Sequence, residues 1–92
     1  MNEQVKMNRE EILAALKTII VENLEHSIPE DAGEDAKTLD DLNIDSIMML
    51  QLIVYLEETF NVNVPDEEVD PAYFETLGSL VTFVEQLLDA KV

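Results

Sequence analysis

The first helical pattern lies near the beginning of the chain. Asn8 and Glu11 have the spacing of an N-cap and its capping box. After them, apolar residues recur every three or four positions, at Ile12, Leu13, Leu16, Ile19, Ile20 and Leu24. We therefore predict a helix from about Arg9 to Glu25. It should end before Pro29, because the residue preceding a proline is pushed out of the helical region.

The second helical pattern is unusually apolar. We predict that this helix begins at Asp45 or Ser46 and ends near Phe60. Asp45 is a good N-cap residue, and its charge is favourably placed against the helix dipole. Between positions 47 and 56 only Gln51 is not apolar. Such a helix is either central in a bundle or partly exposed for a partner.

The last helical pattern is a single apolar stripe, as a core-facing helix requires. Its members are Leu77, Leu80, Val81, Val84, Leu87 and Leu88, and Thr76 is the predicted N-cap. The segment before it has room for one short helix, with Val69, Tyr73 and Phe74 pointing inward. These segments predict an all-α fold: a small four-helix bundle of three main helices and a short one.

A long connection, residues 27–44, joins the first two predicted helices. Connections of this length without structure of their own are uncommon and often functional. Thr38, Asp40 and Asp41 are candidates for capping one short helical turn within it.

Length and composition fit one small folded unit. The chain has 92 residues, of which 47% are hydrophobic, enough for one core. We predict a single domain over residues 1–92, with a flexible N-terminus at residues 1–7. There is no cysteine, which excludes disulfides and leaves the chain without a thiol.

The charge of the chain is strongly negative. It has 21 acidic and 5 basic residues, a net charge of −16, and no basic residue between Thr38 and Ala90. This argues against nucleic acid and anionic membranes as partners, because binding phosphates takes clustered Lys and Arg. The charge either attracts partners with basic patches or serves solubility alone, and it favours a monomer.

No targeting or membrane segment is visible in the pattern. The first eleven residues are polar and charged, and no apolar run approaches the ~20 residues that a membrane span needs. We expect a cytoplasmic location.

Enzymatic and metal chemistry find little support. His26 has no second histidine to form a metal pair, and we interpret it as a surface residue at a helix end. The acidic run 66–70 suggests calcium, but an EF-hand loop starting there would need Gly and Glu where Pro71 and Leu77 stand. We predict neither a metal site nor a catalytic residue.

Ser46 is the most informative hydroxyl. At the start of a helix, free backbone N–H groups and the dipole favour an anion, so a phosphate attached there would be well placed. As a nucleophile in its own right Ser46 has no basic residue nearby in sequence, which makes a small hydrolase a poor hypothesis. A plain helix-cap serine is the simpler alternative.

The run Asp40-Asp41-Leu42-Asn43-Ile44-Asp45-Ser46-Ile47 resembles the modification site of acyl carrier proteins, D-x-L-G-x-D-S-L. The resemblance continues through Leu56-Glu57-Glu58-Thr59-Phe60, Val64-Pro65 and Thr76-Leu77-Gly78-Ser79-Leu80, over about residues 8–89. It implies a carrier rather than an enzyme. A phosphopantetheinyl transferase, expected to bring Mg²⁺, would attach 4′-phosphopantetheine to Ser46. Asp45 would be the motif neighbour that could help at this step, and the arm would supply the thiol for an acyl or aminoacyl thioester.

The chain departs from the family pattern at four positions. Asn43 replaces the usual Gly, although Asn tolerates positive φ better than most residues. Ile47 replaces Leu, and Met48 and Gln51 stand where carriers of fatty acid synthesis usually have acidic residues. These differences favour a specialised lipid, polyketide or aminoacyl pathway.

The resemblance also implies partner contacts along the second helix. Ile47, Leu50, Gln51 and Val54 share one face, and we predict that they contact loading and consuming enzymes with basic docking patches. The alternative is an acidic helical adaptor that is derived from the carrier fold and never modified.

Overall fold

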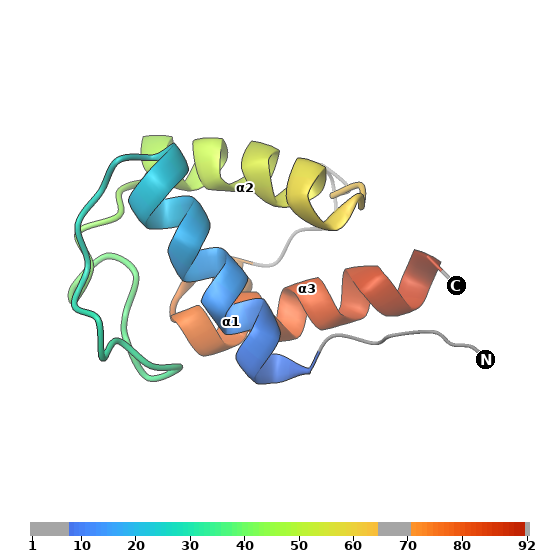
Figure 1. Cartoon of the computed structure of the whole chain (residues 1–92), viewed down its shortest axis with the longest axis horizontal. Helices are drawn as coiled ribbons and strands as arrows, with labels where there is room; N and C mark the ends of the chain where they lie inside the picture. The colour runs from blue at the N-terminus through green and yellow to red at the C-terminus, as the bar shows by residue number, and fades with distance from the viewer. Residues whose placement is uncertain (1–7, 65–70, 92) are drawn as a thin grey trace.

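A computed structural model describes residues 8–64 and 71–91. Its elements are α1 (Arg9–Thr18), the π-helical turn η1 (Ile19–Asn23), α2 (Ser46–Phe60), the 3₁₀ turn η2 (Pro71–Phe74) and α3 (Leu77–Lys91). Figure 1 shows α2 and α3 on opposite sides, with α1 crossing from one to the other and the long connection closing one end. The described residues contain no strand, so the all-α prediction is confirmed. The short fourth helix is a single 3₁₀ turn.

The first helix begins as predicted and ends differently. Asn8 and Glu11 form the capping box, with Oδ1 of Asn8 accepting from the Glu11 N–H at 2.9 Å and Glu11 accepting from the Asn8 N–H at 3.0 Å. The α-helical pattern stops at Thr18 and continues as η1. Glu25 then has a φ of 54°, a left-handed conformation that cannot continue the helix. The predicted end at Glu25 was therefore two residues too far along the chain.

Local signals at both ends fix α2, and its predicted bounds are confirmed. The Asp45 carboxylate accepts a hydrogen bond from the Met48 N–H at 2.9 Å. At the other end, Asn61 has a φ of 56° and donates its N–H to the Glu57 carbonyl. Left-handed Asn is a common helix stop because its short polar side chain tolerates that conformation.

The predicted cap of α3 is also confirmed. Thr76 Oγ1 accepts from the Ser79 N–H, and Ser79 Oγ accepts from the Thr76 N–H, both at 3.0 Å. Tyr73 and Phe74 of η2 place their rings 4.8 and 5.8 Å from the ring of Phe83, which attaches η2 to α3. The predicted inward position of Val69 lies outside the described residues.

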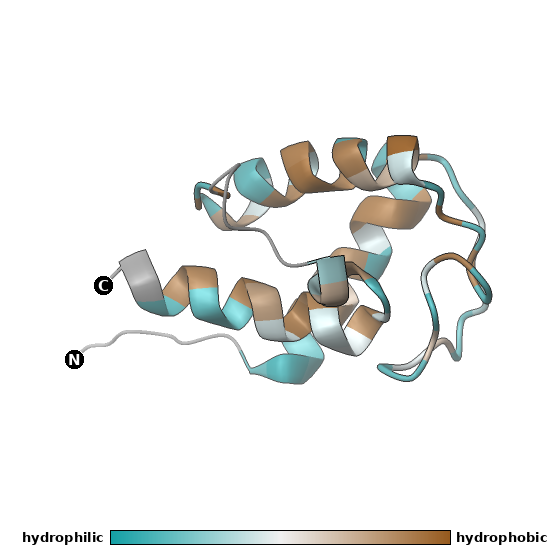
Figure 2. Cartoon of the chain, turned by 180° about the vertical axis from the view of Figure 1, so that it is seen from behind, coloured by the Kyte–Doolittle hydropathy of each residue, from teal (hydrophilic) through white to brown (hydrophobic). Residues whose placement is uncertain are grey.

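The core lies between the three helices. Its fully buried side chains are Ile12, Leu16, Ile20, Leu52, Leu56, Leu77, Leu80, Val81 and Val84. Leu87 and Leu88 complete the predicted stripe as half-buried side chains. α1 packs on α3 and η1 packs on α2. Figure 2 shows hydrophobic colouring on most turns of α2, more than one core-facing stripe requires.

The long connection is attached to the start of α3. Thr38 is buried, and its N–H donates to the Glu75 carbonyl at 2.9 Å. At the N-terminal end of α3, backbone N–H groups have no partner within the helix. The Leu77 N–H donates to the Ala36 carbonyl and the Gly78 N–H donates to the Glu34 carbonyl, both at 3.0 Å. These bonds fix the connection on the bundle. The sequence predicted one short helical turn near Thr38, and residues 38–42 form hydrogen-bonded turns, in which the Asp41 N–H donates to the Lys37 carbonyl at 2.9 Å.

Arg9 reinforces this attachment from the first turn of α1. Its guanidinium lies 2.7 Å from both Glu34 and Glu85, donates to Thr82 Oγ1 at 3.0 Å, and donates to the Gly78 carbonyl at 3.1 Å. The hydrogen bond from Arg9 holds the pKa of Glu34 below its ordinary value. Arg9 thus links α1, the connection and α3.

The flexible N-terminus predicted for residues 1–7 lies outside the described residues. Within the described part of the chain, no helix is long and apolar enough to cross a membrane.

Candidate functional site

Ser46 is the first residue of α2 and is exposed to solvent. Asp45 precedes it in an extended conformation, with its carboxylate turned back onto the Met48 N–H. The Met49 N–H donates to the Asp45 carbonyl, so the N–H groups of Ser46 and Ile47 are the ones that precede the helical pattern. The Ser46 hydroxyl has no hydrogen bond to the described residues. The serine is therefore accessible at an end of a helix that favours an anion.

The turn before Ser46 depends on an unusual backbone conformation. Asn43 has a φ of 58°, the left-handed region that glycine adopts most easily. Leu42 and Ile44 on either side are buried in the core. Asn43 therefore supplies the conformation that the usual glycine would provide at this position, as its tolerance of positive φ suggested.

The same turn is held by His26, a residue that the sequence reasoning left as a surface residue. His26 Nε2 lies 2.6 Å from the Leu42 carbonyl oxygen. Because a carbonyl only accepts, Nε2 carries the proton in this contact. The two residues are 16 positions apart, and no periodicity in the sequence signals their contact.

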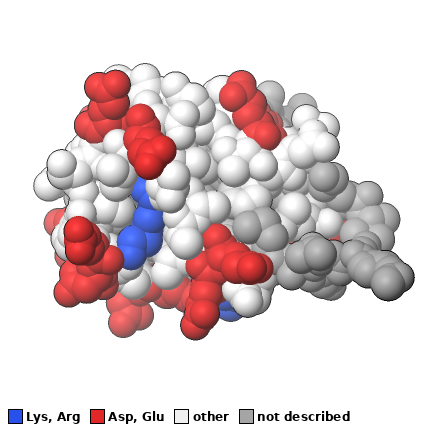
Figure 3. All heavy atoms as spheres, viewed as in Figure 1, with Lys and Arg blue, Asp and Glu red and all other residues white. Residues whose placement is uncertain are grey.

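The outer face of α2 exposes three large apolar side chains. Ile47 is 67% exposed, Leu50 66% and Val54 51%. Gln51 is exposed beside them. We call these four residues the outer face of α2. Figure 3 shows a mostly uncharged surface over α2, with separate acidic patches around it.

Two of the basic residues are already engaged within the fold. Arg9 binds Glu34 and Glu85, and Lys17 donates to the carbonyls of Glu30 and Ala32 at 2.8 Å. The negative field of the other acidic residues is therefore poorly compensated. In the described ranges, no three acidic, His or Cys side chains come together as a metal site.

Comparison with known proteins identifies the family. The phosphopantetheine attachment site family matches residues 14–84, most of the chain. The chain belongs to the acyl carrier protein family. Acyl carrier protein AsbD of Bacillus anthracis is 44% identical over 81 residues, 88% of this chain and 89% of that protein. The acyl carrier protein of Wolinella succinogenes is 37% identical over 70 residues, 76% of this chain and 88% of that protein. The acyl carrier protein of Renibacterium salmoninarum is 42% identical over 78 residues, 84% of this chain and 91% of that protein.

As an acyl carrier protein, the chain is not an enzyme. Its cofactor is covalently attached 4′-phosphopantetheine. The thiol of this group holds the acyl group as a thioester, which the chain could not form by itself because it has no cysteine. An exposed serine hydroxyl at a helix N-terminus fits a phosphodiester-linked group. Carriers of this family act together with separate enzymes.

Proposed function

We propose that Ser46 is the attachment point of the phosphopantetheine arm, with Asp45 as its motif neighbour. The observation that supports this most directly is the exposed, unbonded Ser46 hydroxyl that follows the Asp45 cap. Ser27 and Ser79 are the other serines in the chain. The Ser79 hydroxyl donates to backbone carbonyls and accepts the Thr76 N–H, so it is occupied with capping α3.

The attachment reaction is performed by a phosphopantetheinyl transferase on this serine. Ser46 Oγ forms the new bond to phosphorus as the bond to the adenosine phosphate part of coenzyme A breaks. The transferase takes the hydroxyl proton and brings Mg²⁺. The free N–H groups at the start of α2 then face the phosphodiester anion, which the helix dipole stabilises.

The outer face of α2 is the proposed docking surface for partner enzymes. Ile47, Leu50 and Val54 offer apolar contact area next to the attachment site, and Gln51 lies beside them. The partners are the transferase and the enzymes that load and consume the acyl or aminoacyl group. Their basic patches match the net charge of −16, which steers the encounter.

The composition of α2 supports a specialised carrier. Met48 and Gln51 are neutral where fatty-acid carriers usually have acidic residues, so apolar contact contributes more of the recognition. We propose that the chain is a monomeric, cytoplasmic carrier in a specialised lipid, polyketide or related pathway.

Peptide mass spectrometry of the loaded protein tests the attachment point. After incubation with coenzyme A, Mg²⁺ and the transferase, the arm should appear on the peptide that contains Ser46. An arm on a peptide containing Ser27 or Ser79 would contradict the assignment.

A further inference from the structure

Thr38 is the only buried polar residue in the part of the chain that the structure describes, with an exposed fraction of 3%. A buried hydroxyl has to be hydrogen-bonded, because leaving it without a partner costs free energy that an apolar side chain of the same shape would not. The Thr38 hydroxyl donates to the Phe74 carbonyl at the end of η2 and lies 3.4 Å from the Glu75 carbonyl. This side chain therefore joins the long connection to η2.

The backbone of Thr38 continues this link toward Ser46. Its N–H donates to the Glu75 carbonyl at 2.9 Å, and its carbonyl accepts from the Ile44 N–H at 2.8 Å. Ile44 is buried and lies two residues before Ser46. One residue therefore links the end of η2 to the turn that presents Ser46.

The segment between Thr38 and Ile44 is closed by its own backbone hydrogen bonds. The Leu42 N–H donates to the Lys37 carbonyl, and the Asn43 N–H donates to the Leu39 carbonyl, both at 3.1 Å. The turn is therefore a closed unit, and its position depends on how it is attached to the rest of the fold.

Side-chain packing leaves a gap between this turn and η2. A hollow of about 380 Å³ lies between them, and its lining includes Leu39, Pro71 and Phe74. The Leu39 side chain is 62% exposed, so it is not packed into the core. Apolar contacts therefore contribute little to the attachment here, and the hydrogen bond from the Thr38 hydroxyl contributes more of it.

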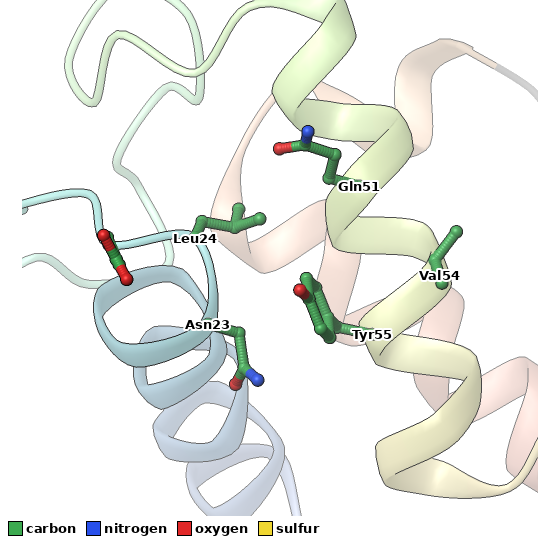
Figure 4. A pocket seen from close by; sticks show the side chains of 6 residues that line it. Asn23, Leu24, Gln51, Val54 and Tyr55 are labelled. Atoms are coloured by element: carbon green, nitrogen blue, oxygen red, sulfur yellow. The ribbon is translucent and has the colours of Figure 1, made fainter.

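The start of α2 is not fixed by packing either. Its first buried side chain is that of Met49. A cleft of about 400 Å³ separates α2 from the end of η1, and Gln51 and Tyr55 point across it toward Leu24 (Figure 4). The direction in which Ser46 faces therefore depends on the turn before it.

We propose that Thr38 is a positioning residue for the loading of Ser46, an inference that rests on the attachment role proposed for that serine. The Thr38 hydroxyl holds the turn on η2 and the Thr38 carbonyl holds Ile44, so Ser46 keeps one direction relative to the core. Group transfer requires aligned reacting atoms, and a misplacement of about 1 Å can lower the rate ~100-fold. Because Thr38 is buried and lies outside the outer face of α2, it should affect the transfer step rather than binding of the transferase.

Loading kinetics test this proposal with variants that differ in one hydroxyl. Thr38→Val keeps the shape of the side chain and removes the hydroxyl, whereas Thr38→Ser keeps the hydroxyl. With a broad-specificity phosphopantetheinyl transferase, coenzyme A and Mg²⁺, Thr38→Val should lower kcat about tenfold and leave the KM for the carrier within about twofold. Thr38→Ser should keep kcat within about twofold of the parent value.

Thr82→Val is the matched control. It removes a hydroxyl of α3 that accepts from Arg9 at 3.0 Å, which is the same chemical change in another part of the fold. It should lower stability, as the loss of one hydrogen bond does, and leave kcat within about twofold of the parent value. Equal kcat values for Thr38→Val and Thr82→Val, or an effect of Thr38→Val on KM alone, would overturn the proposal. If Thr38→Val does not fold, Thr38→Ala and Thr38→Ser give the same comparison, because both lack the methyl group and differ only in the hydroxyl.

Amide measurements separate this inference from the attachment site. If the parent protein is not loaded on Ser46, the proposed function fails, and ¹⁵N NMR of the unloaded protein decides the role of Thr38 alone. In Thr38→Val, the amide signals of residues 44–47 should shift and the Ile44 N–H should exchange faster, whereas neither should change in Thr82→Val. Unchanged signals and exchange at these residues in folded Thr38→Val would overturn the proposal.

Discussion

His26 Nε2 lies 2.6 Å from the carbonyl oxygen of Leu42, which joins the end of the first helical segment to the turn that presents Ser46. The same histidine closes η1 through its backbone N–H. One residue therefore fixes both the end of η1 and the position of the turn. The direction in which Ser46 faces depends on this contact as well as on the local cap at Asp45.

Removing this side-chain contact should loosen the turn. We predict that His26→Ala lowers the free energy of unfolding by ~1 kcal/mol, the usual contribution of one hydrogen bond. Amide exchange of residues 42–45 should become faster. His26→Gln, which keeps an N–H donor, is the control and should restore part of the protection. Unchanged exchange in His26→Ala would show that the turn is held without this contact, by its backbone hydrogen bonds and the buried side chains of Leu42 and Ile44.

Gly78 should not tolerate a larger side chain. A Cβ at this position would lie 2.9 Å from Glu34 Cβ and 3.0 Å from the Glu34 carbonyl oxygen. We predict that Gly78→Ala costs about 1–2 kcal/mol in urea unfolding, although alanine is the better helix former. Gly33→Ala is the control, because a Cβ added there would have nothing within 4 Å. This substitution should be neutral or slightly stabilising. Equal stability of the two variants would show that the contact to Glu34 yields without cost.

The ion pair between Arg9 and Glu34 predicts a small acid dependence. The pKa of Glu34 is lowered from 4.5, mainly by the hydrogen bond from Arg9. A lowered folded pKa gives stability that is present above the unfolded pKa and lost as the pH falls through the folded pKa. Because the two side chains are 38% and 42% exposed, the contribution is below about 1 kcal/mol.

The corresponding measurement compares the parent with Glu34→Gln. The parent should be slightly more stable at neutral pH, and the two free energies of unfolding should converge as the pH falls below 4.5. A difference that increases on acidification would contradict the direction of the pKa shift.

A positive charge on the outer face of α2 should impair docking. Gln51→Lys places a cation on the face proposed to meet basic partners, so loading by a basic-faced transferase should become slower. The effect should be largest at low salt and should shrink as salt screens the repulsion. An unchanged rate at every salt concentration would count against electrostatic docking there.

The sequence predicted those parts of the fold that local signals determine. Asp45 and Thr76 cap their helices as expected, and the stripe on α3 faces the core. The π turn at Ile19–Asn23 was missed, because the apolar spacing does not distinguish it from an α-helix. Contacts across many residues, such as those of Gly78 with Glu34, leave no periodic trace in the sequence.

The same distinction between local signals and long-range contacts holds for the candidate site. The motif around Ser46 and the possible left-handed conformation at Asn43 were visible in the sequence. The contact between His26 and the Leu42 carbonyl was not, since the two residues are 16 positions apart in the chain. Local chemistry was therefore predictable, and the long-range contact that holds the turn was not.

Intact-mass spectrometry after incubation with coenzyme A, Mg²⁺ and a broad-specificity phosphopantetheinyl transferase tests the central claim most directly. Parent and Ser27→Ala should each gain one phosphopantetheine, whereas Ser46→Ala should gain none and remain folded, because Asp45 caps α2 and the Ser46 hydroxyl makes no hydrogen bond to the described residues. A gain by folded Ser46→Ala, or no gain by the folded parent with several transferases, would contradict the claim that Ser46 holds the arm.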